Sequence, residues 1–140
     1  MKIEIPEKKK QVFELTMPIR WGDMDAMGHV NNTVYFRYIE STRIEWFRTL
    51  GCTPGPEGEG PVIINAFCSF RKQLEYPGDI RVRLYTSDPA RATFETWAVI
   101  ERIDDPGVVY AEGGGTTIWV DFPRQKSLTM PDWLREIVSV

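Results

Sequence analysis

Cysteine and long apolar runs are scarce in this chain. Its two cysteines, Cys52 and Cys68, match no metal-ligand spacing and are too few for a disulfide framework. No apolar stretch approaches the ~18 residues that cross a bilayer, and the N-terminal residues lack the apolar centre of a signal peptide. We therefore expect a reduced, cytoplasmic enzyme or binding module without membrane contact.

Basic residues are not in excess either. The 17 Lys and Arg residues are outnumbered by 20 Asp and Glu, which gives a net charge of −3. A nucleic-acid partner is not expected, because no long element concentrates positive charge. The one basic run, residues 8–10, is interpreted as a solvated tail. With 42% hydrophobic and 26% charged residues, the composition is that of one globular domain over residues 1–140.

The chain is organised around residues 21–32 and the helix that follows them. Alternating apolar residues predict a strand over 10–20, and a run without Pro or Gly predicts a helix over 33–50. Asn31 or Asn32 can cap that helix, because an Asn side chain accepts hydrogen bonds from backbone N–H groups two or three residues later. Carboxylates thus precede a helix N-terminus, where unpaired N–H groups can polarise a carbonyl.

Four further strand-like segments and a short helix follow a Pro- and Gly-rich loop over 53–60. The predicted strands are 62–73, 80–86, 93–102 and 108–121, and the helix is 131–138, capped by Thr129. Short turns between strands favour an antiparallel sheet. The run Gly113–Gly115 lacks the Lys and the helix of a phosphate loop, so we expect a bulge or a close backbone approach there.

Two acidic residues and the single histidine are the candidate reactive groups. Asp25 is most simply a turn residue when it is judged from the residues alone, because Asp often bonds nearby backbone N–H groups. Asp23 is interpreted as structural. His29 is the only histidine, and a lone histidine is more often structural or solvated than catalytic.

The same residues carry a family resemblance. The segment Asp23-Met24-Asp25-Ala26-Met27-Gly28-His29-Val30-Asn31-Asn32, followed by Tyr35, Tyr38, Glu40 and Arg43, resembles the hot-dog-fold acyl-CoA thioesterases of the 4-hydroxybenzoyl-CoA thioesterase type. Looser matches follow at Ser69-Phe70-Arg71 and Tyr76-Pro77-Gly78-Asp79. The resemblance implies an α+β hot-dog fold, in which an antiparallel sheet of about five strands wraps around one long helix. It also implies hydrolysis of an acyl thioester to a carboxylic acid and free CoA, with no metal or redox cofactor.

By this resemblance Asp25 matches the catalytic carboxylate, as a general base or as a nucleophile. The backbone N–H at Asn32 is the expected oxyanion donor. Plant acyl-carrier-protein thioesterases are similar around Asp25 and His29, but they have an Asn where this chain has Met27. His29 stays a candidate catalytic residue, and the carboxylate takes the larger role.

The expected substrate contacts are Tyr35, Arg71 and Lys72. The two cations end an apolar run and are most simply solvated charges, but a CoA thioester needs cations for its phosphates. The resemblance places nucleotide contacts near this region. Glu40 and Arg43, three residues apart on the predicted helix, are interpreted as an ion pair.

Self-association and two other functions remain open. The apolar helix flank Phe36, Ile44 and Phe47, together with the family habit of building the site between subunits, predicts a homodimer or homotetramer. A hot-dog hydratase or dehydratase is an alternative enzyme, although the motif fits it less well. A non-catalytic module that binds acyl thioesters is the other alternative. The acyl group itself is not indicated.

Overall fold

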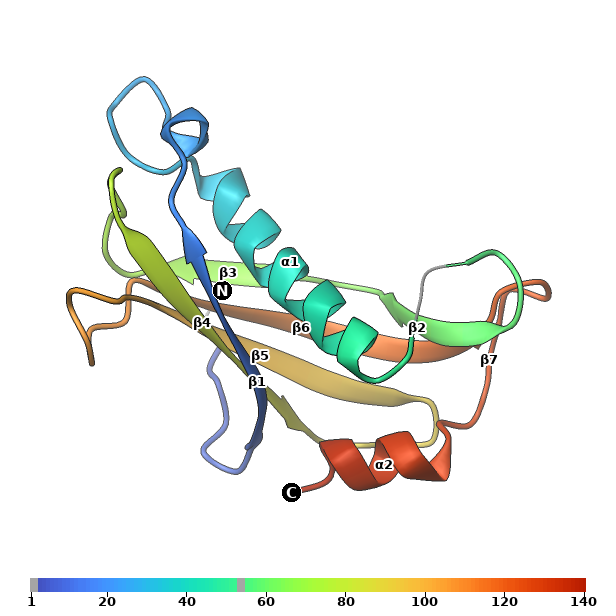
Figure 1. The fold of residues 1–140 in the computed structure, drawn as a ribbon. Helices are drawn as coiled ribbons and strands as arrows, with labels where there is room; N and C mark the ends of the chain where they lie inside the picture. The colour runs from blue at the N-terminus through green and yellow to red at the C-terminus, as the bar shows by residue number, and fades with distance from the viewer. Residues whose placement is uncertain (1–2, 53–54) are drawn as a thin grey trace.

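The strands form one antiparallel sheet that curls around a long helix (Figure 1). The computed structural model describes residues 3–52 and 55–140. Its elements are, in chain order, β1 (Lys10–Pro18), the 3-10 helix η1 (Trp21–Asp23), α1 (Asn32–Thr49), β2 (Glu59–Ile63), β3 (Phe67–Phe70), β4 (Asp79–Ser87), β5 (Thr93–Arg102), β6 (Ala111–Asp121), β7 (Lys126–Ser127) and α2 (Asp132–Val138). The strand order is β1-β4-β5-β6-β2, and β3 and β7 also pair with β6. The predicted α+β architecture is confirmed.

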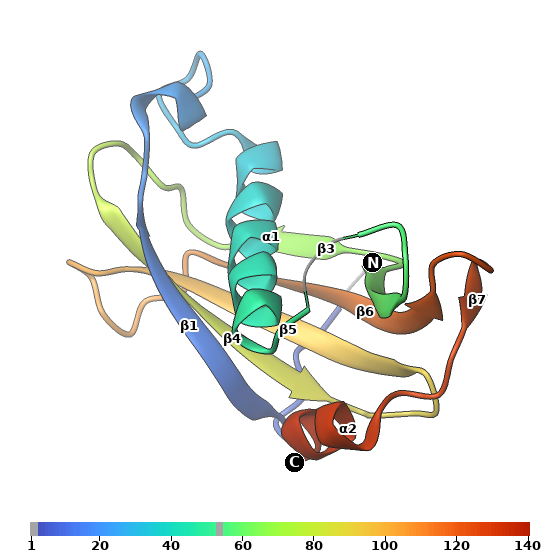
Figure 2. The same cartoon turned by 45° about the vertical axis from the view of Figure 1, so that its right-hand side comes forward.

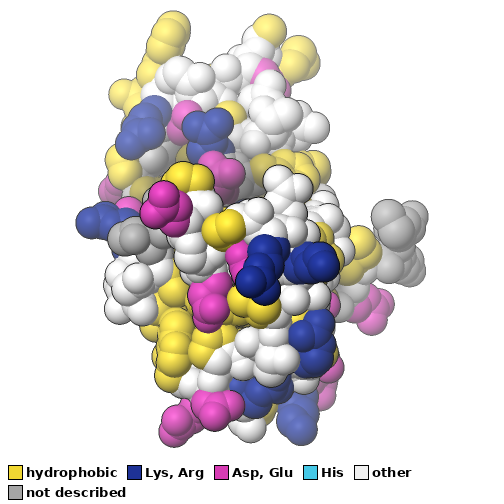
Figure 3. All heavy atoms as spheres, turned by 90° about the vertical axis from the view of Figure 1, so that its right-hand side faces the viewer, with side chains coloured by type: hydrophobic (Ala, Val, Ile, Leu, Met, Phe, Trp, Pro, Cys, Tyr) yellow, Lys and Arg dark blue, Asp and Glu magenta, His cyan; other side chains and the backbone are white. Residues whose placement is uncertain are grey.

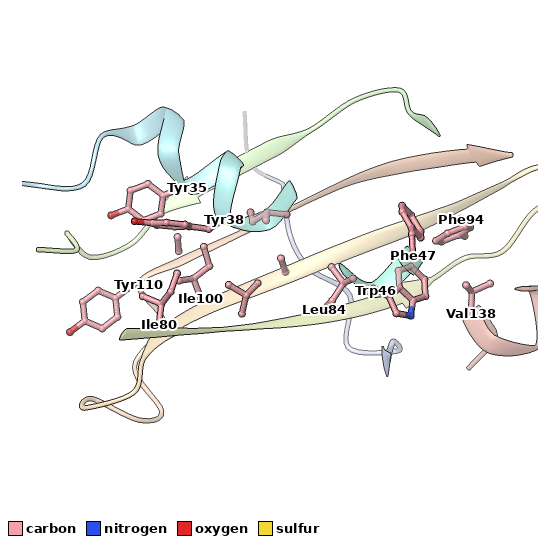
Figure 4. Close-up of a cluster of buried hydrophobic side chains, with 14 of the residues drawn as sticks. Tyr35, Tyr38, Trp46, Phe47, Ile80, Leu84, Phe94, Ile100, Tyr110 and Val138 are labelled. Carbon is pink, nitrogen blue, oxygen red and sulfur yellow. The ribbon is translucent and has the colours of Figure 1, made fainter. Parts of the chain in front are cut away.

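The core lies between α1 and the concave face of the sheet (Figure 2). Alternate residues of β4 and β5 point toward the helix, and Ile80, Leu84 and Ile100 have no exposed surface. Trp46 of α1 packs edge-on against Phe94, with ring centroids 6.1 Å apart. Figure 4 shows these side chains meeting between the two layers. Burying such a side chain stabilises the fold by about 1.5–3 kcal/mol, so this contact fixes where α1 lies.

The glycine run on β6 lets neighbouring backbone and α1 approach the sheet closely. A Cβ added at Gly113 would lie 2.9 Å from Cδ1 of Ile39 on α1, and closer still to the backbone oxygen of Phe67 on β3. The predicted close backbone approach is therefore confirmed. The helix α1 approaches the sheet closely at this point because the glycines of β6 carry no side chains.

The prediction of one strand over 62–73 is wrong. β2 and β3 both pair with β6, but Ile63 pairs with Thr117 whereas Phe67 pairs with Gly114. Asn65 lies in the break: its side-chain oxygen accepts a hydrogen bond from the backbone N–H of Thr116 at 2.8 Å. That side chain satisfies a backbone donor in place of a strand partner and splits the segment in two.

The predicted cap of the last helix is also wrong. α2 begins at Asp132 with Pro131 as its N-cap, and no side chain caps it. Thr129 instead lies 3.3 Å from a guanidinium nitrogen of Arg91. Leu134 and Val138 are the buried residues of α2, and Val138 accepts a hydrogen bond from Thr86 of β4 through its backbone oxygen.

Charges of both signs are mixed on the face shown in Figure 3. In the part of the chain that the structure describes, no helix is both long enough and apolar enough to cross a membrane. Of the loop predicted over 53–60, residues 53–54 lie outside the described residues.

Candidate active site

The loop between η1 and α1 projects beyond the end of the sheet and carries Asp25 (Figure 1). Oδ1 of Asp25 accepts hydrogen bonds from the backbone N–H of Met27 at 2.8 Å and of His29 at 3.3 Å. The Asp25 N–H in turn donates to the backbone oxygen of His29 at 2.7 Å. Gly28 adopts a φ of +80°, which the turn requires and which glycine accommodates without strain. Asp25 therefore has the turn role expected from the residues alone, through one of its two carboxylate oxygens.

The first turn of α1 presents one backbone N–H that its cap leaves free. Oδ1 of Asn31 accepts from the Thr33 N–H at 2.9 Å, and the Asn31 backbone oxygen accepts from the Val34 N–H at 2.9 Å. The cap is therefore Asn31, one of the two residues predicted. Within residues 3–52 and 55–140, the Asn32 N–H has no acceptor. It is the donor at this helix end that can bind an incoming oxygen atom.

All six residues predicted for the site line a single cleft of about 540 Å³. The lining consists of Asp25, His29, Val30, Asn32, Tyr35, Phe70, Arg71, Lys72 and Gln73. The loop and the first turn of α1 supply one wall, and the end of β3 with the residues after it supplies the other. Asp25, the first residue of α1 and two cationic residues thus line one cleft.

Tyr35 joins the two walls. Its side chain is 3% exposed, and its hydroxyl oxygen accepts a hydrogen bond from the backbone N–H of Leu74 at 3.1 Å. The Leu74 backbone oxygen accepts from the Val30 N–H at 2.8 Å. The Tyr35 ring also packs edge-on against Phe70 at 5.0 Å. Burial raises the pKa of Tyr35, so its hydroxyl stays protonated across the physiological range.

Tyr38 and Asp23 anchor the other end of the loop. The Tyr38 hydroxyl donates to Oδ2 of Asp23 at 2.7 Å, and the same oxygen accepts from the Arg20 N–H at 2.9 Å. The Asp23 backbone oxygen accepts from the Asn31 N–H at 2.9 Å. These contacts support the structural interpretation of Asp23. Burial and the Asp23 carboxylate together raise the pKa of Tyr38.

Both predicted cations already have carboxylate partners. Nε of Arg71 donates to Oε1 of Glu112 at 3.1 Å, and Nζ of Lys72 lies 3.4 Å from Oδ2 of Asp105. Tyr110 and Asp105 raise the pKa of Lys72, which therefore stays charged. The two cation side chains remain 55% and 56% exposed. Exposed ion pairs contribute roughly 0–1 kcal/mol, so an incoming anion can compete for these cations.

His29 is paired with a residue that the sequence did not indicate. Its Nε2 lies 3.5 Å from Oε1 of Glu75, in the segment between β3 and β4. No local pattern links these two residues, because they are 46 positions apart. In the described part of the chain, no three His, Cys, Asp or Glu side chains gather as they would around a metal ion.

Comparison with known proteins places this chain in a family. Residues 19–138 match the family model described as the thioesterase-like superfamily. A protein of Aquifex aeolicus named "Putative esterase" is 32% identical over 96 residues, which cover 66% of this chain and 74% of that protein.

Two solved structures share the fold. A Pseudomonas aeruginosa structure described as "a putative Thioesterase" has 34% sequence identity and a TM-score of 0.86, covering 91% of this chain and 98% of that one. A Xanthomonas campestris structure described as "a putative acyl-CoA thioesterase" has 27% identity and a TM-score of 0.77, covering 86% and 100%. The chain therefore belongs to the thioesterase-like superfamily and is a thioester hydrolase.

Proposed function

We propose that this chain hydrolyses acyl-CoA thioesters to a carboxylic acid and free CoA. The observation that carries the proposal is that Asp25 and Asn32, whose backbone N–H has no acceptor in the described part of the chain, line the same cleft. The description of the Xanthomonas campestris structure as an acyl-CoA thioesterase supports the substrate class. Cytoplasmic location and the absence of a required cofactor stay predictions.

The reaction follows from what each group can do. The Asn32 N–H donates a hydrogen bond to the thioester carbonyl oxygen, where negative charge grows as the carbon becomes tetrahedral. Asp25 either takes a proton from the attacking water or attacks the carbonyl carbon itself. In both cases a C–O bond forms and the C–S bond breaks, and the sulfur leaves as the thiol of CoA after gaining a proton. His29 is a candidate for supplying that proton.

The other wall of the cleft is proposed to hold the substrate in place. Tyr35 and Phe70 form an apolar side of the cleft, and Arg71 and Lys72 offer positive charge for the CoA phosphates. Phosphates would share or displace the Glu112 and Asp105 carboxylates. This is feasible because the existing ion pairs are solvent-exposed.

We also propose that the chain forms a homodimer or homotetramer. Phe36 and Ile44 on α1 are 39% and 42% exposed. Exposed apolar side chains that lie together are typical of a surface that binds another subunit. Phe47, the third residue of the predicted flank, is 7% exposed and belongs to the core of the chain itself. Light scattering at micromolar concentration tests this point, and a strictly monomeric mass would exclude it.

The substitution Asp25→Asn tests the catalytic assignment. Asn keeps the size and the acceptor oxygen that bonds Met27 and His29, so the turn survives. It removes the negative charge and with it the base or nucleophile, so kcat should fall by about 10²–10⁴-fold. The measurement is release of free thiol from acyl-CoA. Asp23→Asn is the control, because its effect should follow the loss of thermal stability.

Further measurements separate the open alternatives. A single turnover in ¹⁸O-labelled water leaves the protein unlabelled if Asp25 is a general base, whereas a nucleophile passes through an anhydride that can leave label in its carboxylate. Wild-type protein that binds acyl-CoA without releasing thiol would be a binding module. Near-full activity of Asp25→Asn alongside inactive His29→Ala would show that the assignment to Asp25 is wrong.

A further inference from the structure

A second cleft adjoins the candidate active site and shares Asp25 with it. This second cleft has a volume of about 450 Å³ and is lined by Trp21, Gly22, Met24, Asp25, Ala26, Gly28 and Tyr76. The active-site cleft is lined by Asp25, by the chain from His29 into α1, and by the end of β3 with the residues after it. A carbon atom bound at Asp25 therefore lies next to both clefts.

The two clefts differ in charge. Arg71 and Lys72 line the active-site cleft, whereas Asp25 is the only charged residue among the described residues that line the second cleft. An acyl-CoA thioester is divided in the same way, because the phosphates lie on the sulfur side of the carbonyl carbon and the acyl group lies on the other side. A lining with a carboxylate and no cation repels phosphates and accepts an uncharged group.

The second cleft presents aromatic surface to solvent. Trp21 is 78% exposed and Tyr76 is 45% exposed. Within residues 3–52 and 55–140, neither ring packs against another aromatic ring. Aromatic side chains carry a large apolar surface, and ligand clefts typically combine such surface with a few polar groups. The lining of this cleft therefore suits an apolar ligand group.

Both aromatic residues are held by hydrogen-bonded turns. The backbone oxygen of Trp21 accepts a hydrogen bond at 3.3 Å from the residue that ends η1. On the other wall, the Arg102 guanidinium donates to the backbone oxygens of Glu75 at 2.7 Å and Pro77 at 2.8 Å, and these two residues flank Tyr76. The two walls are therefore in place before a ligand binds, which lowers the entropy cost of binding.

From these observations we infer that the second cleft binds the acyl group of the substrate, and that Trp21 and Tyr76 select it. The inference rests on the proposed thioesterase function. The carbonyl carbon lies at Asp25, the CoA portion lies along the active-site cleft, and the acyl group extends toward Trp21. The favoured substrates are thioesters whose acyl group is uncharged, apolar and long enough to reach the two rings. Water gives OH to the acyl carbon and a proton to the sulfur as the C–S bond breaks.

The test compares hexanoyl-CoA with acetyl-CoA, because only the hexanoyl group has methylene groups that extend into the second cleft. We expect the wild-type protein to have a kcat/KM about 10–100-fold higher for hexanoyl-CoA, the range for partial burial of the additional methylene groups. Hexanedioyl-CoA has the same chain length and a terminal carboxylate. It should lose this advantage, because the described lining of the cleft contains no cation.

Substitutions of the two aromatic residues test their role. Trp21→Ala should reduce the preference for hexanoyl-CoA over acetyl-CoA about 10-fold, Trp21→Phe should retain part of it, and Tyr76→Ala should act in the same direction as Trp21→Ala. Both side chains are exposed, so their truncation leaves the core intact. Trp133→Ala is the matched control: Trp133 is 43% exposed on α2 and lines neither cleft, so the preference should be unchanged.

The outcomes distinguish the inference from the function on which it rests. Binding of hexanoyl-CoA and acetyl-CoA to the Asp25→Asn variant, measured by calorimetry, reports the preference without turnover. If thiol is never released but this binding preference is present and is lost on adding Trp21→Ala, the proposed function fails and the inference stands. If wild-type protein hydrolyses both thioesters equally, or if neither aromatic substitution changes the preference, the inference is overturned. Dissociation of an oligomer by Trp21→Ala, with equal losses on both thioesters, would assign Trp21 to a contact between copies and also overturn it.

Discussion

Replacing Asn32 with proline would remove the backbone N–H proposed as the oxyanion donor while leaving α1 able to form. Asn32 is the first residue of the helix, a position where proline is favoured because its missing N–H has no partner within the helix. Asn31 has φ −59° and ψ 137°, a conformation that a residue before proline readily adopts. The cap bond from Thr33 to Asn31 is untouched.

The expected loss is that of one oxyanion donor. Removing such a donor typically costs about 10²–10³ in kcat, or roughly 2.7–4 kcal/mol of transition-state stabilisation. KM should change little, because the bond strengthens only as charge develops on the carbonyl oxygen. The melting temperature should also change little. Asn32→Ala is the matched control: it removes the side chain, keeps the N–H and should retain most of the activity.

Activity is followed by the reaction of released CoA with a thiol reagent. The protein contributes little background, because burial raises the pKa of the Cys68 thiol to about 12 and also raises that of Cys52. If Asn32→Pro folds and retains wild-type kcat, the oxyanion assignment is refuted. If Asn32→Ala loses as much activity as Asn32→Pro, the side chain rather than the backbone N–H is the important group.

Two further predictions concern the anchors and the cations of the site. Tyr38→Phe should cost about 1.5–3 kcal/mol of stability, because Asp23 loses a hydrogen bond to a charged group. Because the pKa of Tyr38 is raised in the folded state, the stabilisation by its protonated hydroxyl is present below pH 10 and is lost as the pH rises further. The melting temperature measured from pH 8 to 11 should therefore fall less steeply for Tyr38→Phe than for wild type. Replacing Arg71 and Lys72 together with Gln should raise KM for acyl-CoA about 10-fold with little change in kcat, and should have less effect on a thioester that lacks the nucleotide. Arg124→Gln, an 80% exposed charge outside the cleft, is the control, and equal losses on both thioesters would argue against phosphate contacts.

Local patterns determined most of the elements. The strand predicted over 93–102 matches β5 residue for residue, because alternation along a strand with one face on the core is visible in the sequence. The helix over 33–50 is confirmed to within a residue at each end, since its Asn31 cap and the positive φ of Gly51 are local features. Asp25 and Asn32 share one loop and helix start, so their proximity also followed from the sequence.

Contacts between distant segments were decided only by the tertiary structure. Arg71 and Lys72 are about 40 residues from Asn32, and their place in the cleft depends on how β3 pairs with β6. The Tyr35 contact with Leu74, the Glu75 partner of His29 and the break at Asn65 depend on the same register. The burial of Arg43 could not be predicted either. The ion pair predicted between Glu40 and Arg43 does not form, because Glu40 pairs with Arg37 at 3.6 Å, and only the packing of α1 leaves Arg43 8% exposed.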